Sequence, residues 1–87
     1  VGAGPAGSSL AMRLSRRGRS VLVVDGARFP RSKPCGEGIQ PAGVAALEEL
    51  GLGPALAGLV EPFEGIRYRL PDGTAAEGRF PGGARGW

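Results

Sequence analysis

The first 25 residues carry two regular patterns of apolar and polar side chains. Ala6, Leu10 and Leu14 recur at four-residue spacing, which predicts a helix with one apolar face. Gly18 follows this pattern and suits the left-handed conformation that often ends a helix. Residues 20–25, Ser-Val-Leu-Val-Val-Asp, form a short and nearly unbroken apolar run. Such a run is typical of a parallel strand buried on both faces.

The pattern changes after Asp25. Residues 26–40 contain several Gly, Pro and charged residues without periodicity, so we expect a loop. A second helix is predicted to begin at Pro41 and to end at Gly51. Its apolar face consists of Val44, Leu47 and Leu50. A brief turn is expected at residues 53–57, followed by a connector over residues 58–64.

The C-terminal third predicts a β-hairpin. Residues 66–70 alternate apolar and charged side chains, which is typical of a half-exposed strand. The sequence Pro71-Asp72-Gly73 is a turn, in which Pro fixes φ and Gly supplies a positive φ. Residues 74–80 return as the partner strand.

These elements predict an α/β fold. If Val1 is the last residue of an earlier strand, the order strand, helix, strand is a βαβ unit, whose crossover is right-handed. We therefore expect an incomplete Rossmann-like domain: βαβ, second helix, then β-hairpin. The chain starts without Met at a glycine motif and ends just after another glycine-rich stretch. We expect residues 1–87 to be one partial domain, truncated at both ends.

Charge and composition exclude some classes of partner. The net charge is +3 and the pI is about 10. Four arginines cluster where the first helix should end, and there they complement the helix dipole. These are Arg13, Arg16, Arg17 and Arg19. Because no basic run is interleaved with aromatic residues, we predict no nucleic-acid partner.

Cysteine usage and hydropathy bear on location. Cys35 is the single cysteine, so no internal disulfide can form, which fits a reducing compartment. No apolar run approaches the roughly 20 residues of a membrane span, and no signal peptide is visible. We expect a cytoplasmic protein without a transmembrane segment in this piece.

A glycine-rich loop precedes the first helix. Gly2-Ala3-Gly4-Pro5-Ala6-Gly7 matches the pattern G-x-G-x-x-G of dinucleotide-binding loops. Gly2 permits the tight turn, Gly4 lets the backbone approach a pyrophosphate, and Gly7 allows close packing of the helix. The helix N-terminus offers N–H groups and partial positive charge to the phosphates. The alternative is that these glycines only shape a tight connection.

Asp25 completes the pattern. It ends the predicted second strand, 23 residues after Gly2, close to the separation of about 20 residues expected for a carboxylate that binds an adenosine ribose. The carboxylate also disfavours NADP at this site, because it repels a 2′-phosphate. The alternative is that Asp25 is a solvated strand end. The pattern alone does not separate FAD from NAD.

The next segment carries further candidates. Arg28, Arg31 and Lys33 supply positive charge that can offset a pyrophosphate, or they are ordinary solvated side chains. Gly36 and Gly38 permit close backbone approach to a flat or anionic ligand.

The loop G-A-G-P-A-G, the acid at Asp25 and the block F-P-R-S-K-P-C-G-E-G together resemble one family. They look like the start of flavoproteins of the geranylgeranyl reductase group, which belongs with the p-hydroxybenzoate hydroxylase-like flavin monooxygenases. The resemblance runs from Val1 to about Phe80. It implies that the first loop and helix, including Ala3, Pro5 and Ala6, hold the pyrophosphate of FAD. One departure is that the acid is Asp, where many FAD binders have Glu.

The same resemblance implies a role for the segment around Cys35. Cys35, Gly36 and Gly38 would contact FAD near the ribityl chain and flavin. We expect Cys35 to be structural or to contact flavin rather than to be catalytic, because no residue of this chain would activate the thiol. No catalytic residue is identified, and we predict no metal site.

We therefore predict the FAD-binding segment of a flavin-dependent oxidoreductase, inactive by itself. The parent enzyme would act on a small, apolar substrate, with NAD(P)H as a possible electron donor. It would either reduce an isoprenoid-like double bond or be a monooxygenase of the aromatic or polyketide type. The alternatives are an NAD-linked dehydrogenase domain and a noncatalytic dinucleotide-binding module. The dehydrogenase alternative does not explain residues 33–38 or a hairpin in place of the next βα unit.

Overall fold

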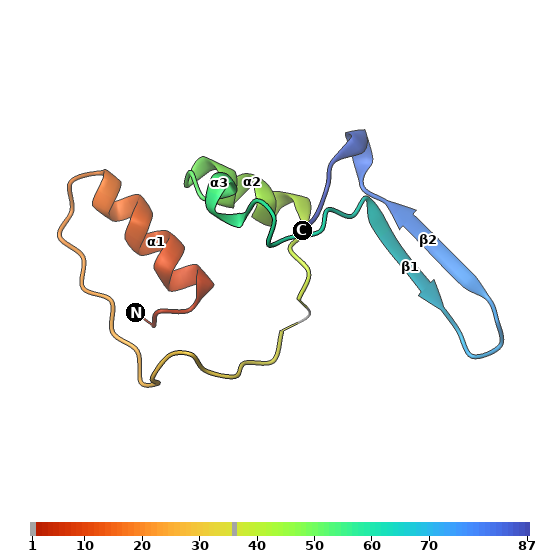
Figure 1. Cartoon of the computed structure of the whole chain (residues 1–87), viewed down its shortest axis with the longest axis horizontal. Coiled ribbons are helices and arrows are strands. Elements are labelled where there is room, and N and C mark those ends of the chain that lie inside the picture. Colours follow the sequence, from red (N-terminus) through yellow and green to blue (C-terminus); the bar gives the residue numbers. More distant parts are fainter. Residues whose placement is uncertain (1, 36) are drawn as a thin grey trace. The chain divides into compact units, whose positions relative to one another are not determined.

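The computed structural model describes every residue except Val1 and Gly36. The chain mixes helices and strands and divides into two units, residues 1–34 and residues 35–87, which are treated separately below (Figure 1). The elements are α1 (Pro5–Arg16), α2 (Pro41–Glu49), α3 (Gly53–Leu56), β1 (Gly65–Arg69), β2 (Ala75–Arg79) and the 3₁₀ turn η1 (Pro81–Gly83).

Helix α1 confirms the first predicted helix. Pro5 occupies its first turn, where the missing N–H costs no hydrogen bond. Gly18 has φ of 71°, and the N–H of Arg19 donates to the carbonyl of Leu14 at 3.1 Å. Together with a bond from the N–H of Gly18 to the carbonyl of Ser15, this is a Schellman motif. Glycine therefore ends the helix where the sequence predicts.

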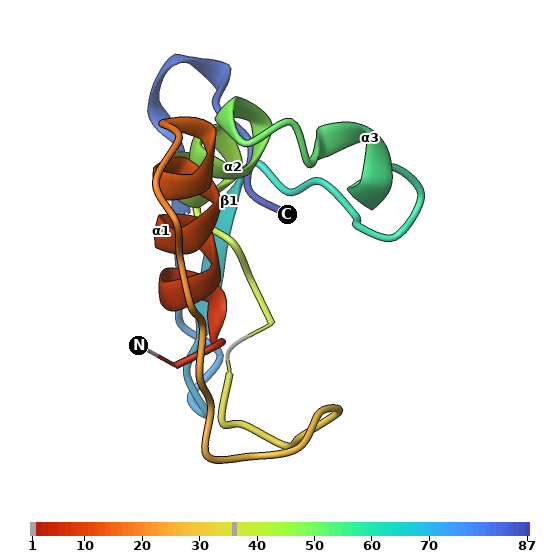
Figure 2. The same cartoon turned by 90° about the vertical axis from the view of Figure 1, so that its left-hand side faces the viewer.

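Residues 20–25 contradict the predicted second strand. They follow α1 as extended chain that runs back along the helix (Figure 2), but no strand among the described residues pairs with them. Leu22 is 83% exposed and Val24 is 59% exposed, so the expectation of burial on both faces is also wrong. The physical reason is that a parallel strand needs a neighbour to bond its N–H and C=O groups.

The predicted βαβ unit is accordingly not formed in the described part of the chain. Its first strand rested on Val1, which lies outside the described residues. The coarser prediction, a chain of mixed helices and strands, is confirmed. The predicted loop is also confirmed, because the described residues between 26 and 40 form neither helix nor strand.

The second unit has a small apolar centre on α2. Val44 is 6% exposed and Leu50, just after the helix, is 2% exposed. Gly51 has φ of 67° and ends the helix in a second Schellman motif, in which the N–H of Leu52 donates to the carbonyl of Leu47 at 3.0 Å. The start, apolar face and end of the second predicted helix are therefore confirmed. The brief turn expected next is the four-residue helix α3.

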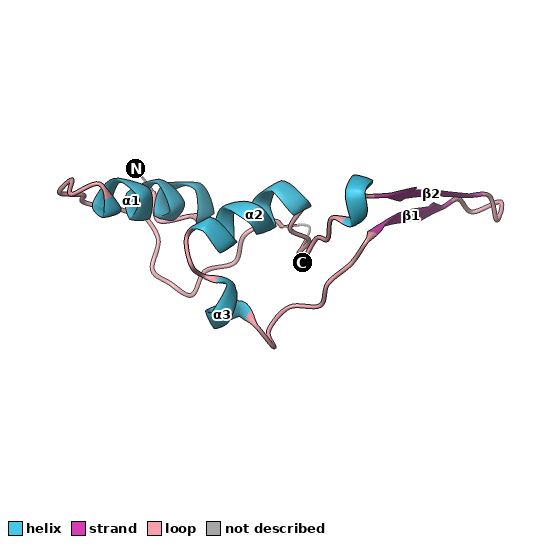
Figure 3. Cartoon of the chain, turned by 90° about the horizontal axis from the view of Figure 1, so that it is seen from above, coloured by secondary structure: helices cyan, strands magenta, loops and turns pink. Residues whose placement is uncertain are grey.

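Strands β1 and β2, the magenta arrows in Figure 3, form the predicted hairpin. They pair antiparallel, with Arg67 opposite Glu77 and Tyr68 opposite Ala76. In the turn, Gly73 has φ of 89°, and the N–H of Thr74 donates to Oδ1 of Asp72 at 2.8 Å. Proline, aspartate and glycine thus act in the turn as their chemistry predicts.

The last residues close the second unit on itself. Gly86 exchanges two backbone hydrogen bonds with Phe63, and Trp87 exchanges two with Ile39. Gly86 is buried, and a Cβ on it would collide with the ring of Phe63. The ring of Phe63 also lies 5.5 Å from that of Phe80, centroid to centroid. Periodicity cannot predict these isolated pairings, because each joins only one residue from each of two segments and leaves no repeating pattern.

Candidate functional site

The glycine loop lies at the open N-terminus of α1. Gly4 is the N-cap residue, with φ of −69° and ψ of 175°, and no side chain caps the helix. The first turn contains no acidic residue. The early N–H groups of an uncapped helix lack partners within the helix and carry partial positive charge. The loop therefore presents the kind of terminus that binds phosphate groups.

Asp25 is bound to this loop by its side chain. Its Oδ2 accepts a hydrogen bond from the N–H of Ala3 at 2.8 Å, across 22 residues of sequence. Its Oδ1 accepts a second bond, from the N–H of Ala27 at 2.9 Å. The hydroxyl of Ser8 donates to the carbonyl of Ala3 at 2.9 Å and joins the loop to the first turn of α1. The structure thus brings together the glycine loop and the acid that follows it.

Backbone hydrogen bonds keep Asp25 ionised. The bond from Ala27, then the bond from Ala3, lower the pKa of the carboxyl group below its usual value, and the charge of Arg31 adds to the effect. Each carboxylate oxygen has two lone pairs, so both can still accept a further hydrogen bond. A carboxylate in this state can accept hydrogen bonds from the hydroxyls of a ribose.

The glycines differ in the space around them. A Cβ on Gly2 would lie 3.2 Å from Oδ2 of Asp25, so a side chain there would crowd the carboxylate. A Cβ on Gly4 would lie 3.8 Å from Nη2 of Arg31, which is ordinary contact. The chain itself therefore has room for a Cβ at Gly4. A requirement for glycine at this position would come from a ligand.

The other predicted site residues lie further along the chain. Arg28 and Lys33 are exposed in the first unit, with no hydrogen bond or ion pair to the described residues of the loop. Cys35 and Gly38 belong to the second unit, and both are exposed. Gly36 lies outside the described residues.

Two residues of this site were not among the predicted candidates. They are Ser8 and Ala27. The bond from Ala27 has a signal in the sequence, because an Asp often accepts from the N–H two residues later in an Asx turn. The contact of Ser8 has no such signal, since it depends on where the loop lies in space. Arg31, which the sequence offered as a source of positive charge, lies near Gly4.

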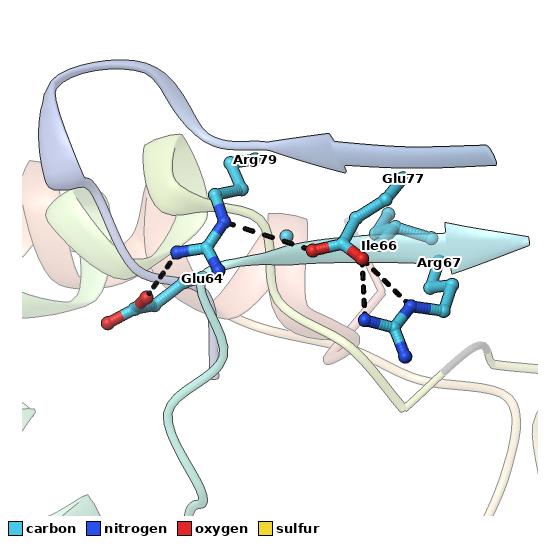
Figure 4. Close-up of a pocket in the computed structure, with 6 residues that line it drawn as sticks. Glu64, Ile66, Arg67, Glu77 and Arg79 are labelled. Carbon is cyan, nitrogen blue, oxygen red and sulfur yellow. Dashed lines mark hydrogen bonds and ion pairs between the residues drawn. The ribbon is translucent and has the colours of Figure 1, made fainter.

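A hollow on the hairpin is lined by charged side chains that already pair with one another (Figure 4). Arg67 donates twice to Oε2 of Glu77, at 2.6 and 2.8 Å. Arg79 bonds Glu64 at 3.3 Å, and its Nε lies 3.8 Å from Glu77. Hydrogen bonding from Arg67, more than any other contact, lowers the pKa of Glu77. Because these exposed charges satisfy each other, we do not place the functional site here.

The part of the chain that the structure describes contains neither a cluster of metal-binding side chains nor a helix that could span a membrane. No group of three or more His, Cys, Asp or Glu side chains is arranged to hold a metal ion. None of the helices has the length and apolar character to cross a membrane.

Comparisons with known proteins identify the family. The family described as "FAD binding domain" matches residues 1–72. The chain is 61% identical over 57 residues to a menaquinone reductase of Mycobacterium tuberculosis, which is 66% of this chain and 14% of that protein. It is 44% identical over 59 residues to the squalene epoxidase erg1 of Aspergillus fumigatus, which is 68% of this chain and 12% of that protein.

A third relative covers more of the chain. The digeranylgeranylglycerophospholipid reductase 1 of Methanothermobacter thermautotrophicus is 36% identical over 75 residues, which is 85% of this chain and 18% of that protein. The chain thus spans less than a fifth of the length of these curated relatives. No solved structure matches it significantly. The resemblance predicted from the sequence and the expectation of FAD as the cofactor are confirmed: the chain belongs to the FAD binding domain family.

Proposed function

We propose that the chain is the FAD-binding segment of a longer flavin-dependent oxidoreductase. In this proposal Gly2, Ala3 and Gly4 approach the pyrophosphate of FAD, and Pro5, Ala6 and Gly7 open the helix whose N-terminus faces it. Asp25 accepts hydrogen bonds from the adenosine ribose. When bound, the flavin supplies the redox chemistry of the enzyme, and the chain binds and orients it.

One observation carries this proposal: the hydrogen bond from the N–H of Ala3 to Oδ2 of Asp25. The two parts of the dinucleotide-binding pattern are distant in sequence, and this bond brings them into direct contact. A carboxylate held beside an uncapped helix N-terminus supplies donors for phosphates and an acceptor for ribose in one place.

We further propose that residues 20–25 become a strand in a Rossmann-like sheet of the complete protein. Val21, Leu22, Val23 and Val24 are all at least 39% exposed here, and a sheet would bury them. The family resemblance also supports contacts of FAD with Cys35, Gly36 and Gly38 near the flavin. Arg28 and Lys33 add positive charge on the side of the pyrophosphate.

For the whole enzyme we propose reduction of a small, apolar substrate in the cytoplasm, with NAD(P)H as electron donor. The identity of 61% to menaquinone reductases, against 44% to a squalene epoxidase, favours a reductase over a monooxygenase. The quinone and isoprenoid lipid named for the relatives indicate the substrate class. Anaerobic turnover of a quinone or a polyprenyl alkene distinguishes the two reactions, because a monooxygenase requires oxygen.

The experiment that tests flavin binding is Gly4→Val in the longest protein that the reading frame encodes. We expect the variant to fold and to purify without flavin, because a Cβ on Gly4 makes only an ordinary contact within the chain, whereas the bulk of valine blocks the pyrophosphate. Gly78→Val is the matched control, since a Cβ on Gly78 meets nothing within 4 Å and lies in the hairpin. A folded Gly4→Val protein that retains FAD would overturn the proposal.

A further inference from the structure

Arg31 reaches the glycine loop from the segment that follows Asp25. Its Nη2 atom lies 3.8 Å from the position that a Cβ would take on Gly4. No atom of Arg28 or Lys33 lies within 4 Å of that position. Arg31 is therefore the cation of this segment whose charged group lies over the loop. We propose that Arg31 is a further cofactor-binding residue, whose guanidinium contacts the pyrophosphate of FAD above Gly4. This inference rests on the proposed function.

The guanidinium is positioned by its own neighbour. Its Cζ lies 5.5 Å from the centroid of the Phe29 ring, a cation–π contact. Among the described residues no carboxylate lies within 4.0 Å of Arg31, so no ion pair holds it elsewhere. This contrasts with the hairpin, where Arg67 and Arg79 are each bound to glutamates. The donors of Arg31 remain available for an anion.

The helix terminus alone leaves part of the ligand charge unbalanced. A helix N-terminus acts as roughly half a positive charge, whereas the pyrophosphate of a dinucleotide carries about two negative charges. Pro5 has no N–H to offer in the first turn. A guanidinium supplies a full charge and a planar fork of donors that matches two phosphate oxygens. Arg31 thus complements the terminus in both charge and geometry.

The test compares Arg31→Gln and Arg31→Lys with Arg69→Gln in the longest protein of the reading frame, after removal of its flavin. Arg69 lies in β1 and is exposed, so it controls for loss of one positive charge. Dissociation constants for FAD, ADP and riboflavin are measured by flavin fluorescence, directly or by competition, over a series of salt concentrations. ADP carries the phosphates without flavin, and riboflavin carries the flavin without phosphates.

We expect Arg31→Gln to weaken the binding of FAD and of ADP by the same factor, about 10- to 100-fold. The affinity for riboflavin should not change. The substitution should also lower the salt dependence of FAD binding, because one ionic contact is lost. Arg31→Lys should restore part of the affinity, since an ammonium keeps the charge without the fork. Arg69→Gln should match the wild type.

The contrary outcomes separate the two proposals. If the wild type binds FAD, and Arg31→Gln binds both FAD and ADP as tightly as the wild type does, the proposed role of Arg31 is wrong and the proposed function stands. If the affinity for riboflavin falls together with the affinity for FAD, Arg31 only supports the fold, and its proposed contact with the pyrophosphate is wrong. Where Arg31→Gln does not fold, the affinity and salt dependence of Arg31→Lys decide. If the wild type does not bind FAD, the proposed function itself fails.

Discussion

The carboxylate of Asp25 accepts a hydrogen bond from the backbone N–H of Ala3 at 2.8 Å. The residue that ends the extended segment 20–25 therefore holds the glycine loop that precedes α1. The same carboxylate accepts from Ala27 and keeps free lone pairs on both oxygens. Asp25 thus has a role before any ligand binds. It shapes the glycine loop, and in the proposed function it presents an acceptor for the ribose while the loop meets the pyrophosphate.

Asp25→Asn should weaken FAD binding by roughly tenfold or more, because an amide carries no charge and its NH₂ cannot accept from Ala3 or Ala27. Flavin fluorescence quenching on the longest protein measures the change. Asp72→Asn is the control, since Oδ1 of Asp72 accepts from the N–H of Thr74 in the hairpin turn, a bond of the same kind. Equal affinity in both variants would exclude a special role for Asp25.

The pH dependence of flavin retention should follow the same carboxylate. The pKa of Asp25 is lowered in the folded chain. The contribution of the carboxylate to the stability of the folded loop is therefore fully present above the unfolded pKa, near 4, and is lost as pH falls through the lower folded pKa. Flavin should stay bound from pH 8 down to about pH 5, and the contribution of Asp25 to flavin binding should be lost only below about pH 4, because the folded pKa lies below the usual value. The difference between wild type and Asp25→Asn, titrated in parallel, isolates this group. A difference that does not change with pH would contradict the assignment.

Leu50→Ala should destabilise the second unit. Leu50 is 2% exposed beside α2, and truncating such a side chain costs about 2–5 kcal/mol, with the lower end expected in a core this small. Leu59→Ala is the matched substitution at a side chain that is 78% exposed, where we expect a change within about 0.5 kcal/mol. Urea unfolding of both variants measures the difference. Equal loss of stability would show that Leu50 is not a core residue.

Gly65→Ala should disturb the hairpin. A Cβ on Gly65 would collide with the carbonyl oxygen of Gly78 and lie 2.9 Å from the Cα of Arg79. Overpacking of this kind typically costs about 1–3 kcal/mol. Gly78→Ala is the control on the partner strand, where a Cβ meets nothing within 4 Å. Amide hydrogen exchange of residues 65–79 should accelerate in the first variant alone.

The sequence predicted helices and turns well because their signals are local. Gly18 and Gly51 end α1 and α2 with positive φ, as expected from their positions after each apolar pattern. The hairpin likewise follows from alternation and from Pro71-Asp72-Gly73. These features depend on a few neighbouring residues, whose conformational preferences can be inferred without the rest of the fold.

The strand predicted at residues 20–25 shows the limit of such inference. Its apolar run is a property of the sequence, but its hydrogen bonds must come from other strands. The position of Arg31 near Gly4 has the same character, because it depends on the course of residues 26–34 in space. Spacing alone pairs Asp25 with the glycine loop, and the structure shows a hydrogen bond between Asp25 and Ala3. The contact of Asp25 with a ribose stays a prediction.

Identification of the nucleotide in the purified protein tests the central claim most directly. The longest protein encoded by the reading frame would be purified, denatured, and its released small molecules separated by chromatography and identified by absorbance and mass. We predict FAD at about one molecule per chain, with a yellow protein before denaturation. A folded, colourless protein that also takes up no added FAD, or one that releases NAD in place of flavin, would contradict the account.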